Sequence, residues 1–386
     1  MQLQPALALS LFYLATFAVL GVYLPYLNLY LEGLGLSGLQ IGIVSSLVPL
    51  CGALAPAAGG VLSDRLGRRR GLVVLSTLLA MLAFSLLPGA RHFGGIALVV
   101  ALYAVLRAPA LPLVEASAME ISEAGGPHYG RMRAWGSAAF IVAALGAGRL
   151  VALWGEAAIV PVVIVLLGFN VLAALLLPGD RPRPARPVGG PPLLTLLRGP
   201  GISFFLMACV LSQAAHGPYY VFYSIHLEKA GYGPQAIGLL WGLAVACEVV
   251  AMLRVGPLLA RAGPLPTMAA CLVLSAVRWW ICAASSSPAP MVVAQVLHAA
   301  SYAAFHVAAV THTHRIFGPE RRASGQAIYA SATYGVGNVL GMFLSGVFYD
   351  RVPTARLFAA AAWAALAAAF LVAAAARRGE RSARGV

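Results

Sequence analysis

The chain of 386 residues is 61% hydrophobic and only 10% charged. Soluble globular domains carry roughly a quarter charged residues, so this composition excludes a water-soluble enzyme or binding module. A helix that crosses a membrane needs about 20 apolar residues, and at about 30 residues for a span with its connection the chain has room for about 12 spans. The net charge of +14 at pH 7 then indicates basic cytoplasmic loops rather than nucleic-acid binding.

Twelve apolar segments, bounded by charges and by glycine and proline, are predicted to cross the membrane. The first six cover residues 6–31, 38–62, 71–88, 94–116, 131–152 and 156–177, and the second six cover residues 201–228, 235–259, 266–286, 290–314, 323–349 and 354–376. We therefore expect an all-α integral membrane protein with an N-terminal six-helix bundle (1–178), a Pro- and Gly-rich cytoplasmic linker (179–200), a C-terminal six-helix bundle (201–376) and a basic cytoplasmic tail (377–386).

The arginines of the loops give the orientation. Placing both termini in the cytoplasm puts most loop arginines, including those of the linker, on the inner side. Cytoplasmic loops of membrane proteins carry an excess of lysine and arginine. The sequence therefore predicts a multi-pass protein of a bacterial-type inner membrane with both termini inside.

A short motif occurs twice. GVLSDRLGRRR (60–70) follows the second predicted span, and GPLLARAG (256–263) follows the eighth. Both fit G-x-x-x-(D or A)-R-x-G, which favours duplicated halves, as in transporters built from internal repeats. The alternative is that helix ends with small residues followed by arginine are simply common in membrane proteins.

The stretch 60–70 resembles the loop motif of the major facilitator superfamily, G-x-x-x-D-(R/K)-x-G-(R/K)-(R/K). The resemblance implies two pseudo-symmetric six-helix bundles around a central cavity and a cycle of alternating access. It also implies a conformational latch formed by Gly60, Asp64, Arg65, Gly67 and Arg68. A carboxylate at this place can face a helix N-terminus or a cytoplasmic arginine. The alternative is that the arginines only set the topology.

Charged residues inside the predicted spans are the next signal, because a charge at the bilayer centre costs at least about 2.5–3.5 kcal/mol. Arg107 and Glu115 fall on the fourth span, Arg133 on the fifth, Glu248 on the eighth and Arg278 on the ninth. An unpaired buried charge is strongly unfavourable. We expect these residues to pair across a hydrated cavity.

With His298 on the tenth span, these charges resemble lactose permease and its oligosaccharide–proton symporter relatives. The resemblance implies that Glu115 and Arg133 hold the substrate and that Glu248, Arg278 and His298 form the coupling network.

Two positions differ from that pattern. Ser301 stands where the relatives have a carboxylate, and the aromatic residue that stacks on the sugar, a Trp in lactose permease, falls at Phe140. The stretches 128–140, 212–232 and 295–310 resemble more closely the phenylpropionate permease branch of the same superfamily. This resemblance indicates the class of mechanism better than it indicates the identity of the ligand.

Two polar stripes share one spacing. Successive residues of a helix are about 100° apart, so residues at offsets 0, 3, 7 and 11 lie on one face. The first stripe is Gln213, His216, Tyr220 and Ser224, and the second is Gln295, His298, Tyr302 and His306. Hydrogen bonds between packed helices, worth about 0.6 kcal/mol on average, are one explanation. The matched positions in spans seven and ten favour cavity lining instead.

The predicted function is proton symport of a small organic solute that resembles an aromatic carboxylate. The predicted substrate-binding residues are Glu115, Arg133, Phe140, Gln213, His216, Tyr219, Tyr220, Tyr223, Arg278, Gln295, His298 and Tyr302. Glu248 and His298 are predicted to exchange the proton, since histidine titrates near physiological pH. If Arg107 also faces the cavity, the net positive charge of the cavity favours an anionic ligand. If Arg107 faces away, a neutral ligand is favoured instead.

Alternatives within transport are an oligosaccharide or nucleoside proton symporter and a metabolite or drug efflux antiporter. A different class is a transport-dead membrane receptor or scaffold. No catalytic constellation or nucleotide-binding motif occurs in the sequence, so we expect neither an enzyme nor a cofactor. His312 and His314 lack the further ligands that a metal site needs, so no metal is expected. The expected partners are a small-molecule substrate, a proton and the lipid bilayer, without nucleic acid, and the chain is expected to be a monomer.

Overall fold

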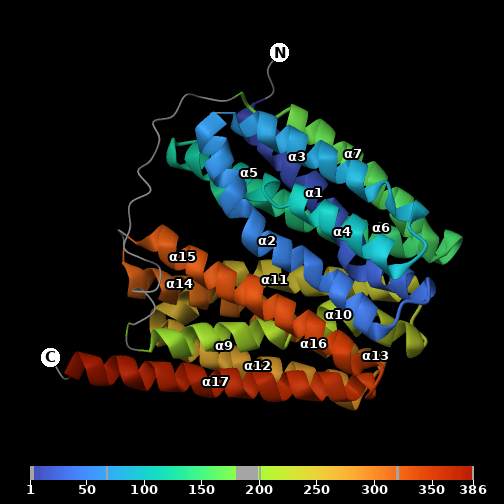
Figure 1. Ribbon diagram of the computed structural model, residues 1–386. Helices are drawn as coiled ribbons and strands as arrows, with labels where there is room; N and C mark the ends of the chain where they lie inside the picture. The colour runs from blue at the N-terminus through green and yellow to red at the C-terminus, as the bar shows by residue number, and fades with distance from the viewer. Residues whose placement is uncertain (1–3, 67, 180–198, 200, 319–320, 385–386) are drawn as a thin grey trace. The chain divides into compact units, whose positions relative to one another are not determined.

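Helices form the regular structure of the described residues in the computed structural model (Figure 1), which covers residues 4–66, 68–179, 199, 201–318 and 321–384. Side chains are described in these ranges except for residues 54–66, 323 and 379–384. Within these ranges there is no strand. The composition explains this, because only a helix satisfies all its backbone hydrogen bonds within one segment crossing a membrane.

The described residues of the first half form seven α-helices. They are α1 (Pro5–Gly33), α2 (Gly38–Leu66), α3 (Arg69–Phe84), α4 (Phe93–Arg107), α5 (Ala110–Glu123), α6 (Tyr129–Trp154) and α7 (Ile159–Leu175), with short 3-10 helices at Leu87–Gly89 and Glu156–Ala158. The predicted fourth span therefore consists of two helices, α4 and α5, and it continues to Glu123, beyond the predicted end at residue 116. Glu115 consequently lies inside α5.

The second half contains more interrupted helices. They are α9 (Ile202–Ala214), α10 (Gly217–Lys229), α11 (Pro234–Ala262), α12 (Pro264–Ala284), α13 (Pro288–His298), α14 (Phe305–Phe317), α15 (Arg322–Ala330), α16 (Asn338–Tyr349) and α17 (Thr354–Arg384). Two π-helical segments complete the spans: η3 (Ala299–Ala304) joins α13 to α14, and η4 (Ser331–Gly337) joins α15 to α16. Such π-segments frequently occur at functional sites.

Ten helical stretches of the described residues are long and apolar enough to cross a membrane. A shorter apolar helix covers Gly38–Ala53 of α2. The predicted seventh span is divided between α9 and α10, and Ala215 and His216 lie at the break. The chain is a multi-pass membrane protein on this count.

The chain forms two compact units, and each has its own packing. Unit 1 comprises Met1–Arg186 and Leu227–Gly242, and unit 2 comprises Pro187–His226 and Leu243–Val386. In unit 1, α1 packs against α6 and α7, and an apolar core gathers around Phe12 and Tyr13 of α1.

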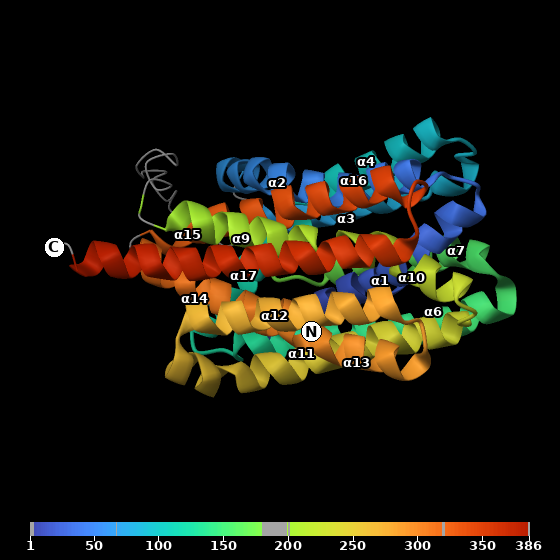
Figure 2. The ribbon, with the colours of Figure 1, turned by 90° about the horizontal axis from the view of Figure 1, so that it is seen from below.

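In unit 2, α17 packs against α12 and α9, and α12 and α17 run side by side in Figure 2. The core there includes Phe205, Met268 and Tyr329.

Glycine permits close helix contacts in both units. A Cβ at Gly21 of α1 would lie 2.4 Å from the carbonyl oxygen of Phe140 on α6. A Cβ at Gly217 of α10 would lie 2.2 Å from the carbonyl oxygen of Gly341 on α16. These backbones approach more closely than any side chain at the glycine would allow. Small residues at such crossings are typical of membrane helices.

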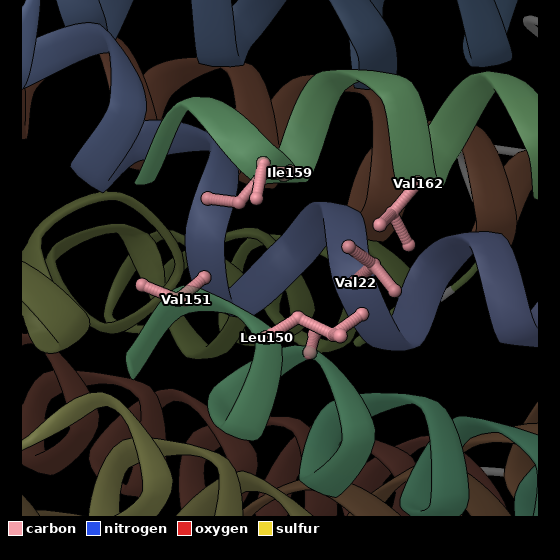
Figure 3. Close-up of a pocket in the computed structure, with 7 residues that line it drawn as sticks. Val22, Leu150, Val151, Ile159 and Val162 are labelled. Carbon is pink, nitrogen blue, oxygen red and sulfur yellow. The ribbon is translucent and has the colours of Figure 1, made fainter. Parts of the chain in front are cut away.

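A small pocket in unit 1 is entirely apolar. It is lined by Val22, Ala147, Leu150, Val151, Ala158, Ile159 and Val162, and Figure 3 shows side chains of α1, α6 and α7 converging on it. Its lining offers no hydrogen-bond donor or acceptor from a side chain. A polar solute needs such groups for orientation, so this pocket does not fit one.

Candidate functional site

Arg278 of α12 is fully buried, and neighbouring groups hold its guanidinium on several sides. The guanidinium carbon lies 4.3 Å from the ring centroid of Tyr219 and 4.1 Å from that of Trp279. Its Nε donates to the carbonyl oxygen of Ala294 at 3.0 Å, and its Nη1 donates to Oγ of Ser301 at 3.1 Å. Among the described residues, Nη2 has no hydrogen-bond partner and Arg278 forms no ion pair. The buried guanidinium therefore has one donor edge, at Nη2, that no described residue uses.

Other buried polar atoms without partners belong to residues around Arg278. Gln295 of α13 accepts a hydrogen bond from the hydroxyl of Tyr219 at 3.1 Å, which leaves its Nε2 without a partner among the described residues. The same holds for Nε1 of Trp279, whose ring meets the ring of His216 edge-on at 5.1 Å. Amide and indole N–H groups can only donate. The unused groups therefore suit an acceptor such as a carboxylate.

His216 lies at the break between α9 and α10. Its Nδ1 is 2.8 Å from the carbonyl oxygen of Ser212, and a carbonyl can only accept, so Nδ1 carries the proton. Within the described part of the chain its Nε2 has no partner. The ring of Tyr220 stacks on the imidazole with centroids 5.9 Å apart. The neutral ring can therefore accept a hydrogen bond from a ligand.

Glu248 and His298 form a direct pair in unit 2. Oε1 of Glu248 on α11 lies 2.8 Å from Nε2 of His298, the last residue of α13. The side chains are 15% and 4% exposed, respectively, so the pair is largely shielded from bulk solvent. Tyr302 stacks on the imidazole with centroids 5.5 Å apart. This arrangement can hold a proton between a carboxylate and an imidazole.

The remaining predicted residues of unit 2 lie in helix contacts. Gln213 donates from Nε2 to Oδ1 of Asn338 at 2.8 Å, which joins α9 to α16. The hydroxyl of Tyr223 lies 3.9 Å from Sδ of Met291, and its ring packs on Tyr219 at 4.9 Å. These two side chains therefore take part in the packing of helices in unit 2.

Unit 1 brings together its own predicted pair. Nε of Arg133 on α6 lies 3.9 Å from Oε1 of Glu115 on α5, and the hydroxyl of Tyr129 lies 3.5 Å from the same oxygen. The guanidinium of Arg133 also lies 3.8 Å from the ring centroid of Phe17. Phe140 is buried two turns farther along α6.

Sequence reasoning did not select Phe17, Tyr129 or Trp279 for these sites. Trp279 directly follows Arg278 in the chain, and an aromatic residue beside an intramembrane arginine is the signal that could have indicated it. Phe17 lies on α1 four residues after Tyr13, and both rings contact the guanidinium of Arg133. Only the packing of α1 against α6 reveals that contact.

The side chains of the predicted latch fall mostly outside the described part of the structure. Gly67 is not described, and only the backbone of α2 is described at Gly60, Asp64 and Arg65. Arg68 is exposed and precedes α3.

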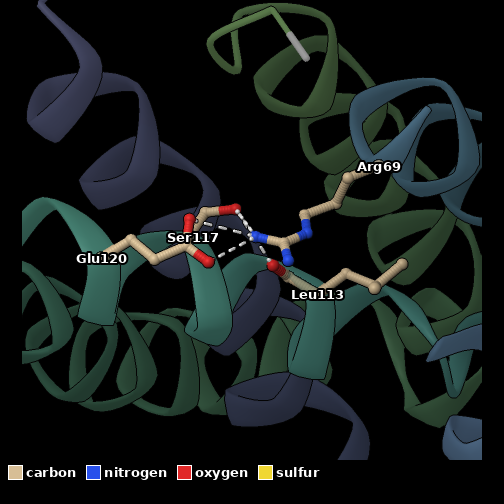
Figure 4. Close-up of polar contacts among 4 residues, drawn as sticks. All are labelled: Arg69, Leu113, Ser117 and Glu120. Carbon is tan, nitrogen blue, oxygen red and sulfur yellow. Dashed lines mark hydrogen bonds and ion pairs between the residues drawn. The ribbon is translucent and has the colours of Figure 1, made fainter. Parts of the chain in front are cut away.

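The next residue, Arg69, makes contacts that are described. Its Nη1 donates to Oγ of Ser117 at 3.0 Å and lies 3.3 Å from Oε1 of Glu120 on α5 (Figure 4). Ser117 in turn donates to the carbonyl oxygen of Leu113 at 3.2 Å. These contacts therefore connect the first residue of α3 to α5.

Comparisons with known proteins cover nearly the whole chain. The model of the MFS_1 like family matches residues 6–360. A protein of Escherichia coli (strain K12) named "Probable 3-phenylpropionic acid transporter" is 29% identical over 360 residues, which covers 91% of this chain and 93% of that protein. A "Maltose permease" of Geobacillus stearothermophilus is 25% identical over 349 residues, with 88% and 87% covered.

Solved structures share the fold. The crystal structure of nucleoside transporter NupG superposes with a TM-score of 0.83 at 18% identity, and the match covers 97% of this chain and 99% of that one. At this level of identity the likeness concerns the arrangement of helices alone.

Proposed function

Since the chain belongs to the MFS_1 like family and is a transporter of the major facilitator superfamily, we propose that it carries a small aromatic carboxylate across a bacterial inner membrane together with a proton. The name of the Escherichia coli relative, a probable 3-phenylpropionic acid transporter, supports this class of substrate. The chemistry of unit 2 supports it independently.

The observation that carries the proposal is the unused donor edge of Arg278. No described acidic residue pairs with this buried guanidinium. A ligand carboxylate would form an ion pair with the guanidinium and accept a charge-assisted hydrogen bond from Nη2. Gln295 and Trp279 offer further N–H donors nearby. The rings of Tyr219 and Tyr302 offer aromatic faces that suit an aromatic substrate.

Proton coupling is proposed for Glu248 and His298. With Glu248 ionised and His298 neutral, the pair carries one negative charge that balances Arg278. Binding a carboxylate at Arg278 adds a negative charge, and taking up one proton at the pair removes it again. The loaded site is then neutral overall, which favours movement through a closed state because exposing net charge to the membrane interior is costly.

Topology and the remaining sites complete the proposal. We place both termini in the cytoplasm on the basis of the loop arginines, divide the chain into the bundles 1–178 and 201–376 with a linker and tail, and expect a monomer. In unit 1, we propose Glu115 and Arg133 as substrate-binding residues of an alternating-access cycle, with Phe140 providing an aromatic face. The latch at residues 60–68 would favour one conformation.

A neutral sugar is the second candidate substrate. The salt bridge between Glu115 and Arg133 matches the spacing that oligosaccharide–proton symporters use, and the Geobacillus stearothermophilus relative is named a maltose permease. Under this alternative, Arg278 would serve only the proton pathway, and a carboxylate on the ligand would bring no advantage.

The test is uptake into liposomes that contain the purified protein. With an imposed proton gradient, acid outside, we expect labelled 3-phenylpropionate to accumulate and a protonophore to abolish the accumulation. Unlabelled maltose and uridine should not compete. Accumulation of maltose or uridine with no uptake of 3-phenylpropionate would reject the proposed substrate, and uptake insensitive to the protonophore would reject proton coupling.

A further inference from the structure

A second arginine lies deep within a membrane span of unit 1, at a break between helices. α4 ends at Arg107 and α5 begins at Ala110, within the continuous apolar stretch Phe93–Glu123. Pro109 has no N–H, so it cannot return the usual hydrogen bond to the preceding turn. Arg107 is 14 residues from one end of the stretch and 16 from the other. Its charge therefore lies near the middle of the span, where charge is costly.

Arg107 faces the inside of unit 1 rather than the exposed side of α4. The exposed side carries Leu98, Leu102 and Val105, which are 61%, 43% and 49% exposed. At about 100° per residue, Arg107 projects about 140° or more away from each of them. Its guanidinium carbon lies 5.9 Å from the ring centroid of Tyr103, which is buried. The side chain is directed toward protein, not toward lipid.

Two tyrosine hydroxyls beside Arg107 lack partners. The ring of Tyr23 on α1 stacks on the ring of Tyr103 with centroids 5.9 Å apart, and Phe84 of α3 meets Tyr103 at 5.1 Å. Both hydroxyls are buried, and neither forms a hydrogen bond with any residue that the structure describes. Buried hydroxyls normally have a partner, so a missing group is indicated here.

No acid described in unit 1 supplies the negative charge that Arg107 needs. No described acidic residue forms an ion pair with Arg107. The nearest acid along the span is Glu115, eight residues farther, and it pairs with Arg133. A guanidinium binds a carboxylate through two parallel hydrogen bonds, and phenolic hydroxyls can donate to the same oxygens.

We propose that Tyr23, Tyr103 and Arg107 form an anion site in unit 1 that binds a carboxylate group of a ligand. The ring of Phe84 closes the aromatic side of the site. This site is distinct from Arg278, which belongs to unit 2. It gives the transporter two places at which a carboxylate can be recognised, and it explains why an arginine and two hydroxyls are kept in this apolar environment.

The experiment measures benzoate binding to the purified full-length protein by isothermal titration calorimetry. The starting variant is Arg278→Gln, which removes the buried arginine of the carboxylate site proposed in unit 2. We expect it to retain weak benzoate binding. Adding Arg107→Gln should weaken that binding by at least about tenfold, and adding Tyr103→Phe, which removes one oxygen from a buried ring, should weaken it by about threefold or more, because bonds to charged groups are strong.

Matched controls separate charge from folding. Arg149→Gln removes an exposed arginine of α6 in the same unit and should leave benzoate binding unchanged. Benzyl alcohol has the same ring without the carboxylate and should bind equally to all variants. Arg107→Lys, which keeps the positive charge, should bind benzoate more tightly than Arg107→Gln. Each variant should keep the melting temperature of its parent within a few degrees.

The outcomes distinguish this site from the proposed function. If the Arg278→Gln variant binds no benzoate, the anion site in unit 1 is wrong while the role of Arg278 stands. If adding Arg107→Gln and Tyr103→Phe leaves the affinity of that variant unchanged, the anion site in unit 1 is wrong, and the role of Arg278 is decided by the fall in affinity from the wild type to Arg278→Gln. If Arg278→Gln leaves benzoate affinity at the wild-type value and Arg107→Gln removes it, the anion site is supported and the proposed role of Arg278 is rejected.

Discussion

The carboxylate of Glu248 lies 2.8 Å from Nε2 of His298, and the two residues come from different helices, α11 and α13. His298 is the last residue before the π-segment η3, and Ser301 in that segment donates to the carbonyl oxygen of His298 at 3.3 Å. Ser301 also accepts from Arg278. The proposed proton pair and the proposed carboxylate site are therefore linked through a few residues of η3.

Glu248→Gln separates coupling from binding. The amide oxygen can still accept a hydrogen bond from His298, but the side chain can no longer ionise. We expect exchange of labelled for unlabelled substrate across the membrane to persist, while accumulation driven by a proton gradient is lost. Counterflow and gradient-driven uptake in liposomes measure the two activities. Glu123→Gln, which neutralises an exposed acid of α5, is the control, and equal loss of both activities in Glu248→Gln would show that Glu248 is not the proton carrier.

Ser301→Ala tests the positioning of Arg278. The change removes the acceptor of Nη1, and a hydrogen bond to a charged group is worth about 1.5–3 kcal/mol. We expect the KM for 3-phenylpropionate to rise by about tenfold, with the accumulation ratio at saturating substrate little changed. Ser301→Thr keeps the hydroxyl and should stay within about threefold of the wild type. An unchanged KM in Ser301→Ala would mean that this hydrogen bond does not orient the guanidinium for the substrate.

Tyr26→Phe tests a contact that holds three helices of unit 1 together. The hydroxyl of Tyr26 on α1 lies 3.0 Å from the carbonyl oxygen of Ala144 on α6 and 2.9 Å from that of Pro234 at the start of α11. Removing it deletes a buried hydrogen bond, which costs about 0.5–1.5 kcal/mol of unfolding free energy. The melting temperature should fall measurably. Tyr30→Phe, one turn farther along α1, should have little effect, and an equal fall in both variants would argue against this contact.

Gly217→Ala tests the close crossing in unit 2. The added Cβ would lie 2.2 Å from the carbonyl oxygen of Gly341, and a backbone cannot yield as a flexible side chain can. Overpacking of this kind typically costs about 1–3 kcal/mol, so we expect a lower melting temperature. The control is Gly256→Ala on α11, where nothing lies within 4 Å of the added Cβ and a small gain in helix stability is expected. A Gly217→Ala variant as stable as the wild type would contradict the observed backbone contact.

Composition and one loop motif were enough to predict the class of this protein. The all-α membrane fold and the major facilitator superfamily are confirmed by the family match and the named transporters among its relatives. The physical reason is that a bilayer permits few backbone structures, so an apolar chain with periodic basic loops is expected to form membrane-spanning helices. The confirmed membership also supports the prediction that the chain is not an enzyme.

Side-chain directions beyond a helix irregularity could not be predicted in the same way. The polar stripe from Gln295 to His306 assumes 100° per residue throughout. The π-segment η3 breaks that period after His298, since each π-turn contains more residues than an α-turn. His306 accordingly lies against Tyr329 and Tyr334, whose hydroxyls are 3.0 and 2.8 Å from its Nδ1. Nothing in residues 299–304 signals the change of period.

Contacts between segments that are distant in the sequence could not be fully predicted either. The sequence placed Arg133 and Glu115 on neighbouring helices, and the structure brings them to 3.9 Å. It gave no indication that Phe17 of α1 would face the same guanidinium. Such a contact depends on the rotation of α1 about its axis, and an apolar helix surface does not fix that rotation by composition alone.

The contribution of its carboxylate to the binding of 3-phenylpropionate tests the role of Arg278 most directly. Calorimetric titrations compare this acid with 3-phenylpropanol, its neutral counterpart, on the wild-type protein and on Arg278→Gln. We expect the wild type to bind the acid at least about tenfold more tightly than the alcohol, and we expect Arg278→Gln to lower the affinity for the acid by at least about tenfold while leaving the affinity for the alcohol unchanged. Equal affinity for the acid in both proteins would contradict this role of Arg278.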